Sequence, residues 1–247
     1  MDPVIYHAHN MLRSEDLYFW RGLVVERGFP ILELGCGTGR VLCRLMKDNY
    51  DVVGIDNDPK MIAYLQHIIP PQLSSLVQIV QGDMRTFDLG VQFPLIILPC
   101  NTLSTFDARD RQQIFQQVRK HLEPQGVFVF SIPNTLVLKD LPTEGEPDLE
   151  DEFKHPATHN PIEVYSSWEK KGNAITFRWQ YLHMYPDGNT IEDEHVTTHY
   201  LDLPQAYVAE LRASGLIPVS AFGDFDRQPF NPDSPYFILF AGLAAAA

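Results

Sequence analysis

Three glycines at alternate positions, Gly35, Gly37 and Gly39, follow the apolar run at residues 31–34. A glycine turn between a strand and a helix brings backbone N–H groups and the helix N-terminus close to a ligand. Asp56 follows Gly35 by 21 residues, at the end of a second apolar run. A strand-end carboxylate at about this spacing meets the ribose hydroxyls in nucleotide-binding βαβ units. These residues therefore predict a site for a nucleoside.

Two charged residues beside the turn narrow the class of ligand. A dinucleotide fingerprint would have its third glycine where this chain has Arg40. Glu33 can lie at a sheet edge or surface, but its place before the turn favours a ligand role, and it would repel a pyrophosphate. A cationic nucleoside without phosphate suits the turn better, and S-adenosylmethionine is such a ligand. A nicotinamide-dependent oxidoreductase is the alternative.

The elements that must position these residues alternate between strands and helices. Further strands are expected at residues 51–55, 77–80, 94–98, 127–132, 215–222 and 235–240, and helices at 14–27 (capped by Ser14), 41–47 and 110–122. This alternation predicts a mostly parallel, doubly wound α/β sheet. Ligands bind such sheets at the carboxyl ends of the strands, where Asp83 and Asn101 also fall.

Residues 32–39, Leu-Glu-Leu-Gly-Cys-Gly-Thr-Gly, resemble motif I of the class I S-adenosylmethionine-dependent methyltransferases. Residues 54–56, 82–84, 99–101 and 122–126 resemble the later motifs in order and spacing. The resemblance implies a Rossmann-like seven-stranded sheet with an antiparallel C-terminal hairpin. It also implies that Gly35 and Gly37 hold the methionine end of the cofactor, Asp56 the ribose, and Asp83 and Met84 the adenine. Asn101, on the loop nearest the methyl group, is expected to orient the acceptor. The predicted cofactor site comprises Glu33, Gly35, Cys36, Gly37, Thr38, Gly39, Asp56, Asn57, Gly82, Asp83, Met84, Pro99 and Tyr18.

The alternation is interrupted between residues 134 and 203, which divides the chain into a core (1–133 and 204–247) and an inserted subdomain. Residues 138–152 are acidic and predict a solvated linker. Three strand-like runs follow, joined by two-residue turns at Gly172-Asn173 and Asp187-Gly188.

These two turns also predict the strand register of the inserted sheet. They pair Trp168 with Phe177, Ile175 with Tyr200, and Trp179 with Val196, and they place His195 and His199 on the polar face. The aromatic face must cover something, either the core, a second subunit or, as a lid, the acceptor site.

The amino-acid composition restricts the classes of molecule that the protein is expected to bind. The net charge of -13 and the lack of any Lys/Arg run longer than two residues argue against nucleic acid. Three cysteines without a CxxC pair, no signal pattern and no apolar run of about 18 residues indicate a cytoplasmic protein that is not in a membrane. No metal site is expected, because no carboxylate has a metal-like spacing to His183, His195 or His199; a homodimer is possible.

The function expected from these features is methyl transfer to nitrogen or oxygen of a small molecule by in-line displacement. A protein methyltransferase and a non-catalytic cofactor-binding protein are further alternatives.

Overall fold

A computed structural model of the chain describes residues 1–244. Among these residues, seven strands form one sheet in the order β10-β11-β5-β4-β1-β2-β3. The strands are β1 (Ile31–Leu34), β2 (Val52–Asp56), β3 (Val77–Gln81), β4 (Phe93–Leu98), β5 (Leu122–Pro133), β10 (Leu216–Phe222) and β11 (Tyr236–Leu243). β1 to β5 are parallel, and β11 runs antiparallel to both β5 and β10. The predicted doubly wound sheet with its antiparallel C-terminal hairpin is confirmed.

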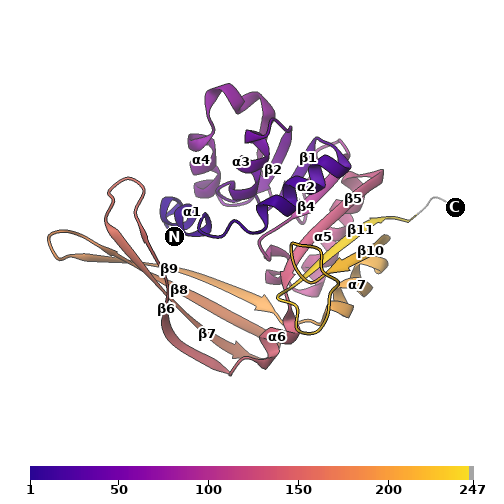
Figure 1. Cartoon of the computed structure of the whole chain (residues 1–247). Coiled ribbons are helices and arrows are strands. Elements are labelled where there is room, and N and C mark those ends of the chain that lie inside the picture. The colour runs from indigo at the N-terminus through magenta and orange to yellow at the C-terminus, as the bar shows by residue number, and fades with distance from the viewer. Residues whose placement is uncertain (245–247) are drawn as a thin grey trace.

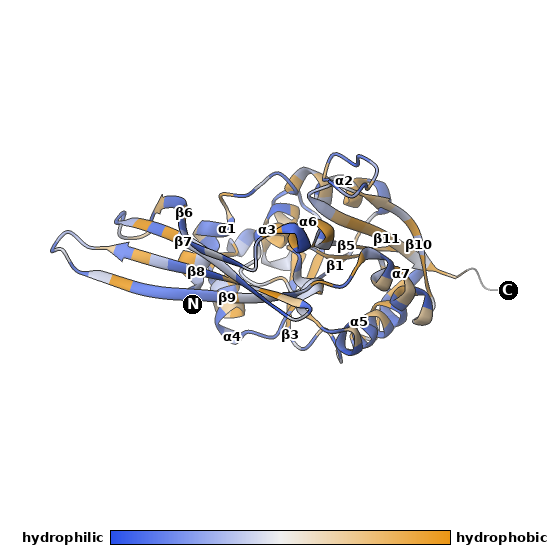
Figure 2. Cartoon of the chain, turned by 90° about the horizontal axis from the view of Figure 1, so that it is seen from below, coloured by the Kyte–Doolittle hydropathy of each residue, from blue (hydrophilic) through white to orange (hydrophobic). Residues whose placement is uncertain are grey.

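Helices cover both faces of this sheet because successive residues of each buried strand point in opposite directions. Leu32 and Leu34 pack in one core cluster with α5 (Ala108–His121) and α7 (Pro204–Ala213). Ile31 packs in a second cluster with α2 (Leu17–Arg27), α3 (Arg40–Lys47) and α4 (Pro59–Ile68). Figure 2 shows hydrophobic colouring along β5 and β11 and hydrophilic colouring over much of the small sheet. Along residues 1–244, no helix combines the length and apolar character needed to cross a membrane.

The N-terminus differs from the sequence prediction. α2 begins at Leu17 instead of being capped by Ser14, and the Asp16 carboxylate binds other side chains instead of the helix. A further helix, α1 (Pro3–Asn10), precedes it; the Asp2 side chain accepts from Val4 N at 2.8 Å. The Asp-Pro pair was an available signal, because Asp favours the N-cap and Pro the first helical position.

The inserted subdomain is a four-stranded antiparallel sheet in the order β6-β7-β8-β9. Its strands are β6 (Glu144–Lys154), β7 (Pro161–Lys171), β8 (Ala174–Met184) and β9 (Thr190–Tyr200), preceded by α6 (Thr135–Asp140). Figure 1 shows it beside α1, with the tips of the β6–β7 and β8–β9 hairpins farthest from the core.

The linker predicted at residues 138–152 is therefore wrong, since much of it is the edge strand β6. Two of its carboxylates, Glu150 and Asp151, pair with Arg13 from the N-terminal segment, and His9 also binds Asp151. These compensating partners are more than 130 residues away, so the local charge run could not indicate them. Charged side chains on an edge strand also discourage pairing with another chain.

The register of the small sheet is right for one hairpin and wrong for the next. Trp168 pairs with Phe177 as predicted, but Trp179 pairs with His195 instead of Val196. The same shift pairs Ile175 with His199 instead of Tyr200. The β8–β9 loop spans the five residues 185–189 and not two, and a one-residue slip moves every side chain of a strand to the other face. His195 and His199 consequently lie on the aromatic face.

Candidate active site

Two connected pockets lie between the carboxyl ends of the core strands and the aromatic face of the small sheet. The first, here called the nucleoside pocket, has a volume of about 290 Å³. It is lined by Tyr6, Gly35, Gly37, Asp56, Asn57, Met61, Gly82, Asp83, Met84, Thr102, Thr105, Phe106 and His195. Seven of these thirteen were predicted from the sequence as cofactor-binding residues.

The glycine turn forms one wall of this pocket. Gly37 N donates a hydrogen bond to Asp56 Oδ2 at 2.7 Å, so the turn is fixed to the end of β2. Gly39 caps α3 with a φ of 84° and lies against Leu65, where a Cβ would be placed well inside van der Waals contact. Glycine is therefore required at this position both by its backbone conformation and by its packing.

Asp56 is already held in place by the backbone. Besides Gly37, its Oδ1 accepts from Asp58 N at 2.9 Å. A carboxylate offers about four lone-pair sites on its two oxygens, so it can still accept hydrogen bonds from a vicinal diol. The geometry suits the predicted ribose contact.

Of the two residues predicted to contact adenine, Met84 is buried and Asp83 is already bound to Arg85. Met84 is buried, and its Cε lies 3.2 Å from the position of a Cβ on Gly35. Asp83 accepts from Arg85 Nε at 3.0 Å and Nη2 at 2.6 Å, and these hydrogen bonds lower the pKa of Asp83. Asp83 thus stays ionised, but an adenine amino group would share its oxygens with Arg85.

Glu33 lies beneath the turn and is neither at a sheet edge nor on the surface. β1 lies between β4 and β2, and Glu33 is 2% exposed. Burial raises its pKa to about 8, and its Oε2 has no hydrogen-bond partner within residues 1–244. A cation bound above the turn would stabilise the ionised form of this carboxyl group, whereas a phosphate would not.

The other predicted residues do not line the nucleoside pocket. Cys36 and Thr38 are buried, and Thr38 Oγ1 lies 3.0 Å from His7 Nδ1 of α1. Pro99 is the first residue of the loop after β4. Tyr18 is 77% exposed and lines neither this pocket nor the neighbouring one, so the structure does not place it over the cofactor.

The second pocket, here called the lid pocket, has a volume of about 460 Å³ and lies under β8 and β9. Its small-sheet wall consists of Trp179, Tyr181, His195, Thr197 and His199, together with Glu150 of β6. Its other walls come from α1, the start of α2, the loop after β4, Ser131, and Phe225 and Tyr236 near the C-terminal hairpin. Tyr6, Thr102, Thr105 and His195 line both pockets, which are thus contiguous.

Asn101 lines the lid pocket from the loop after β4. It and Cys100 adopt left-handed backbone conformations, with φ of 59° and 61°. Such non-glycine residues store strain and cluster at functional sites. The Asn101 Oδ1 atom is buried and makes no hydrogen bond among the described residues. It is a free acceptor at the position predicted to orient the substrate.

His195 lies where the two pockets meet. Its ring stacks on Trp179 at 5.8 Å and meets the edge of Tyr6 at 5.3 Å between centroids. Burial lowers the pKa of His195 and raises that of Tyr6 to about 12. Both groups are therefore neutral at pH 7. The sequence reasoning missed them as a pair, because their contact depends on α1 and on the β9 register.

Arg40 has a structural role at the edge of the lid pocket. Its guanidinium binds Asp16 through two hydrogen bonds, at 2.6 and 2.5 Å, and the Arg13 carbonyl at 2.9 Å. Trp20, a fully buried core residue, also donates to Asp16 at 2.8 Å. Arg40 thereby fastens the start of α3 to that of α2.

One group of side chains could hold a metal by proximity. The ligand atoms of His9, Glu150 and Asp151 lie within 4.8 Å of one another. Arg13 already contacts both carboxylates, so a metal ion would have to displace a guanidinium.

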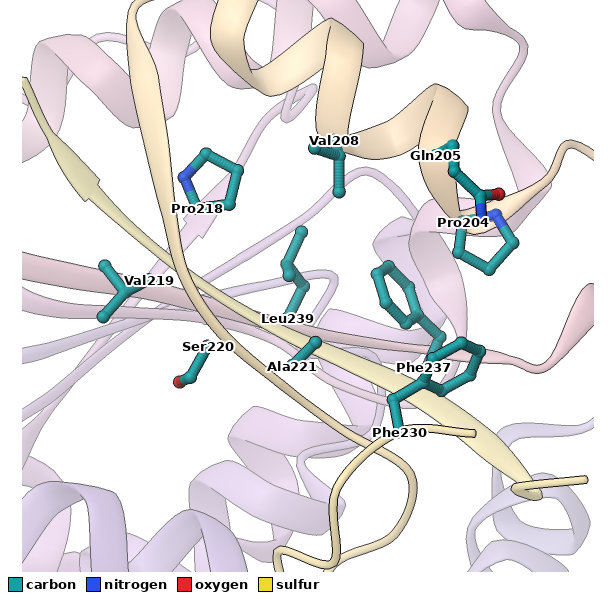
Figure 3. Close-up of a pocket in the computed structure, with 10 residues that line it drawn as sticks. All are labelled: Pro204, Gln205, Val208, Pro218, Val219, Ser220, Ala221, Phe230, Phe237 and Leu239. Carbon is teal, nitrogen blue, oxygen red and sulfur yellow. The ribbon is translucent and has the colours of Figure 1, made fainter. Parts of the chain in front are cut away.

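A separate apolar pocket of about 320 Å³ lies between α7, β10 and β11, away from the glycine turn, and is lined by residues that include Val208, Phe230 and Phe237 (Figure 3).

The strand order with its reversed last strand, the glycine turn and the strand-end Asp56 define a protein of the class I S-adenosylmethionine-dependent methyltransferase type. Residues 31–126 of the chain match the methyltransferase domain family.

Relatives of known sequence agree with this assignment. The chain is 27% identical over 123 residues to the putative methyltransferase YqeM of Bacillus subtilis, covering 47% of this chain and 49% of that protein. It is 30% identical over 135 residues to the dTDP-4-amino-2,3,4,6-tetradeoxy-D-glucose N,N-dimethyltransferase of Saccharopolyspora spinosa, covering 51% of each. The chain spans about half the length of these curated relatives.

The likeness in structure extends over nearly the whole chain. A S-adenosylmethionine-dependent methyltransferase from Clostridium acetobutylicum superposes with a TM-score of 0.81 at 14% identity, covering 97% of this chain and 98% of that one. At this identity the comparison establishes the fold, including the inserted sheet.

Proposed function

We propose that this chain transfers the methyl group of S-adenosylmethionine to an amine nitrogen of a small molecule. The observation that carries the proposal is the junction of the two pockets at Tyr6 and His195. A nucleoside held against Asp56 would reach this junction from one side, and an acceptor in the lid pocket from the other. A pocket of about 460 Å³ beneath a sheet suits a small molecule better than a macromolecule.

The residues present fit S-adenosylmethionine. Asp56 has acceptor capacity for the ribose, and the Gly35 backbone lies beside Met84 where a side chain would intrude. The buried Glu33 carboxyl group favours a cationic ligand over a dinucleotide. When bound, the cofactor supplies an electrophilic methyl group on a sulfonium sulfur.

The chain's own residues orient the acceptor and exclude water, which is what an in-line displacement requires. Tyr6, Trp179 and His195 form an aromatic wall at the junction. An amine attacks with its own lone pair: the new N–C bond forms as the C–S bond breaks, and the resulting ammonium ion then loses a proton to water.

An amine suits this wall better than a hydroxyl group. A hydroxyl acceptor needs a general base with a pKa near the working pH. Burial instead lowers the pKa of His195 and His199, which makes both imidazoles weak bases. The amino-sugar N,N-dimethyltransferase among the relatives supports a nitrogen acceptor as well.

The test measures methyl transfer from radiolabelled S-adenosylmethionine to matched pairs of small amines and alcohols, amino sugars included, with heat-denatured protein as control. Labelled amines are expected. Label only in alcohols, or only in added proteins, would refute the proposal. Calorimetry with S-adenosylhomocysteine and NADH separates the remaining alternatives: binding of the first without any transfer indicates a non-catalytic protein, and binding of NADH alone an oxidoreductase.

A further inference from the structure

A hydrogen-bonded chain joins the small sheet to the loop after β4. His199 of β9 places Nδ1 2.8 Å from Ser104 Oγ, and Ser104 Oγ donates to the Asn101 carbonyl at 2.7 Å. Ser104 lies in the 3-10 helix η2 (Thr102–Thr105) and is fully buried, and His199 is 8% exposed. Both His199 and Asn101 line the lid pocket.

Counting protons along this chain fixes the tautomer of His199. The Asn101 carbonyl can only accept, so it takes the single hydroxyl proton of Ser104. Ser104 Oγ must then accept from His199, and Nδ1 carries the ring proton. Nε2 is left with a lone pair, since the side-chain hydrogen bond of His199 within residues 1–244 is made through Nδ1. Burial lowers the pKa of His199 to about 4, which keeps the ring neutral.

The lid pocket therefore contains two hydrogen-bond acceptors without protein partners among residues 1–244, His199 Nε2 and Asn101 Oδ1. They come from elements that the Ser104 hydroxyl holds together. A neutral primary amine has two N–H bonds and one lone pair. If each N–H is bound by one acceptor, the lone pair takes the remaining direction.

We propose that His199 is a positioning residue for the methyl acceptor, and that its Nε2 and Asn101 Oδ1 each accept one N–H of a primary amine. The proposal rests on the proposed function and adds the substrate class. A primary amine is held by both acceptors and a secondary amine by one. A tertiary amine has no N–H to offer, so methylation ends at the dimethylated product.

Two substitutions at one position separate the positioning role from packing. His199→Asn retains an amide N–H near Nδ1 for Ser104 but has no atom at Nε2, whereas His199→Gln places an amide oxygen close to Nε2. We expect His199→Asn to lower kcat/KM for a primary amine by about 10- to 100-fold, and His199→Gln to stay within about threefold of wild type. His183→Asn is the control, because His183 is a buried histidine of β8 on the same face of the small sheet as His199, and it lines neither pocket.

Each measurement has an outcome that overturns the idea. S-adenosylhomocysteine affinity should be unchanged in all three variants, since His199 lies outside the nucleoside pocket. Equal kcat/KM for His199→Asn and wild type would refute the positioning role, as would an equal loss in the Asn and Gln variants. ¹⁵N NMR of the wild type should show the Nδ1–H tautomer, and the opposite tautomer would refute the proton count. If wild type methylates no amine at all, the proposed function itself has failed.

Discussion

Replacing Asp56 tests the cofactor site most directly. Its carboxylate binds the backbone N–H groups of Gly37 and Asp58 at 2.7 and 2.9 Å, and its remaining lone pairs face the nucleoside pocket. Asp56→Ala removes the predicted ribose contacts and frees the Gly37 N–H. Hydrogen bonds to a charged group contribute about 1.5–3 kcal/mol. We expect cofactor binding to weaken by about 1–3 kcal/mol, which corresponds to roughly 5- to 150-fold in Kd.

The assay is isothermal calorimetry with S-adenosylhomocysteine, which binds without turnover. Asp58→Ala is the matched control, because Asp58 also follows β2 and accepts backbone N–H groups but does not line the nucleoside pocket. As the N-cap of α4, it should cost about 1 kcal/mol of folding stability and leave the affinity unchanged. An Asp56→Ala affinity within twofold of wild type, or an equal loss in the control, would show that the carboxylate does not hold the cofactor.

Three further substitutions or conditions have defined outcomes. Gly39→Ala forces a side chain into a left-handed backbone position against Leu65 and should lower the unfolding free energy by at least about 1–2 kcal/mol, measured by urea denaturation. Asp16→Ala leaves the Arg40 guanidinium buried without its carboxylate, and we expect a loss of about 3–5 kcal/mol; Asp16→Ala combined with Arg40→Met should recover part of it, and no recovery would exclude the pair as the cause. Burial lowers the pKa of His199 from about 6.5 in the unfolded chain to about 4 in the folded protein. The neutral ring's contribution to the unfolding free energy is therefore fully present above pH 6.5 and is lost as the pH falls toward 4, by about 3 kcal/mol in total. His199→Gln should flatten this part of the stability profile, and an unchanged slope between pH 6.5 and 4 would contradict the reasoning.

Part of the lining of the nucleoside pocket was predictable because its sequence signals are local. The turn from Gly35 to Gly39, the carboxylate of Asp56 and the pair Asp83 and Met84 each follow a run whose residues predict a strand. Parallel strands align their carboxyl ends, so recognising the strands was enough to bring these residues together. The prediction that Tyr18 contacts the cofactor was wrong because an aromatic residue near the start of a helix carries no local signal that distinguishes a surface position from a binding-site position.

The lining of the lid pocket could not be predicted in the same way. The β8–β9 loop contains five residues, and the Asp187-Gly188 pair inside it suggested two. Because of this difference in loop length, the predicted register placed His195 and His199 on the polar face of the small sheet, whereas they lie on its aromatic face. The acidic strand β6 is paired with Arg13 and His9, and these contacts require the N-terminal segment to pack against the small sheet.

The sequence by itself determined the sheet, the glycine turn and the chemistry of the methyl donor, because strand periodicity and turn residues act over a few neighbouring positions. Only the tertiary structure decided which side chains line the lid pocket, where we propose that the acceptor binds. The contacts of Tyr6 with His195, and of Ser104 with His199, join segments 189 and 95 residues apart. Their existence depends on strand register and on the docking of α1, and both are set by the packing of the whole molecule and not by any local pattern.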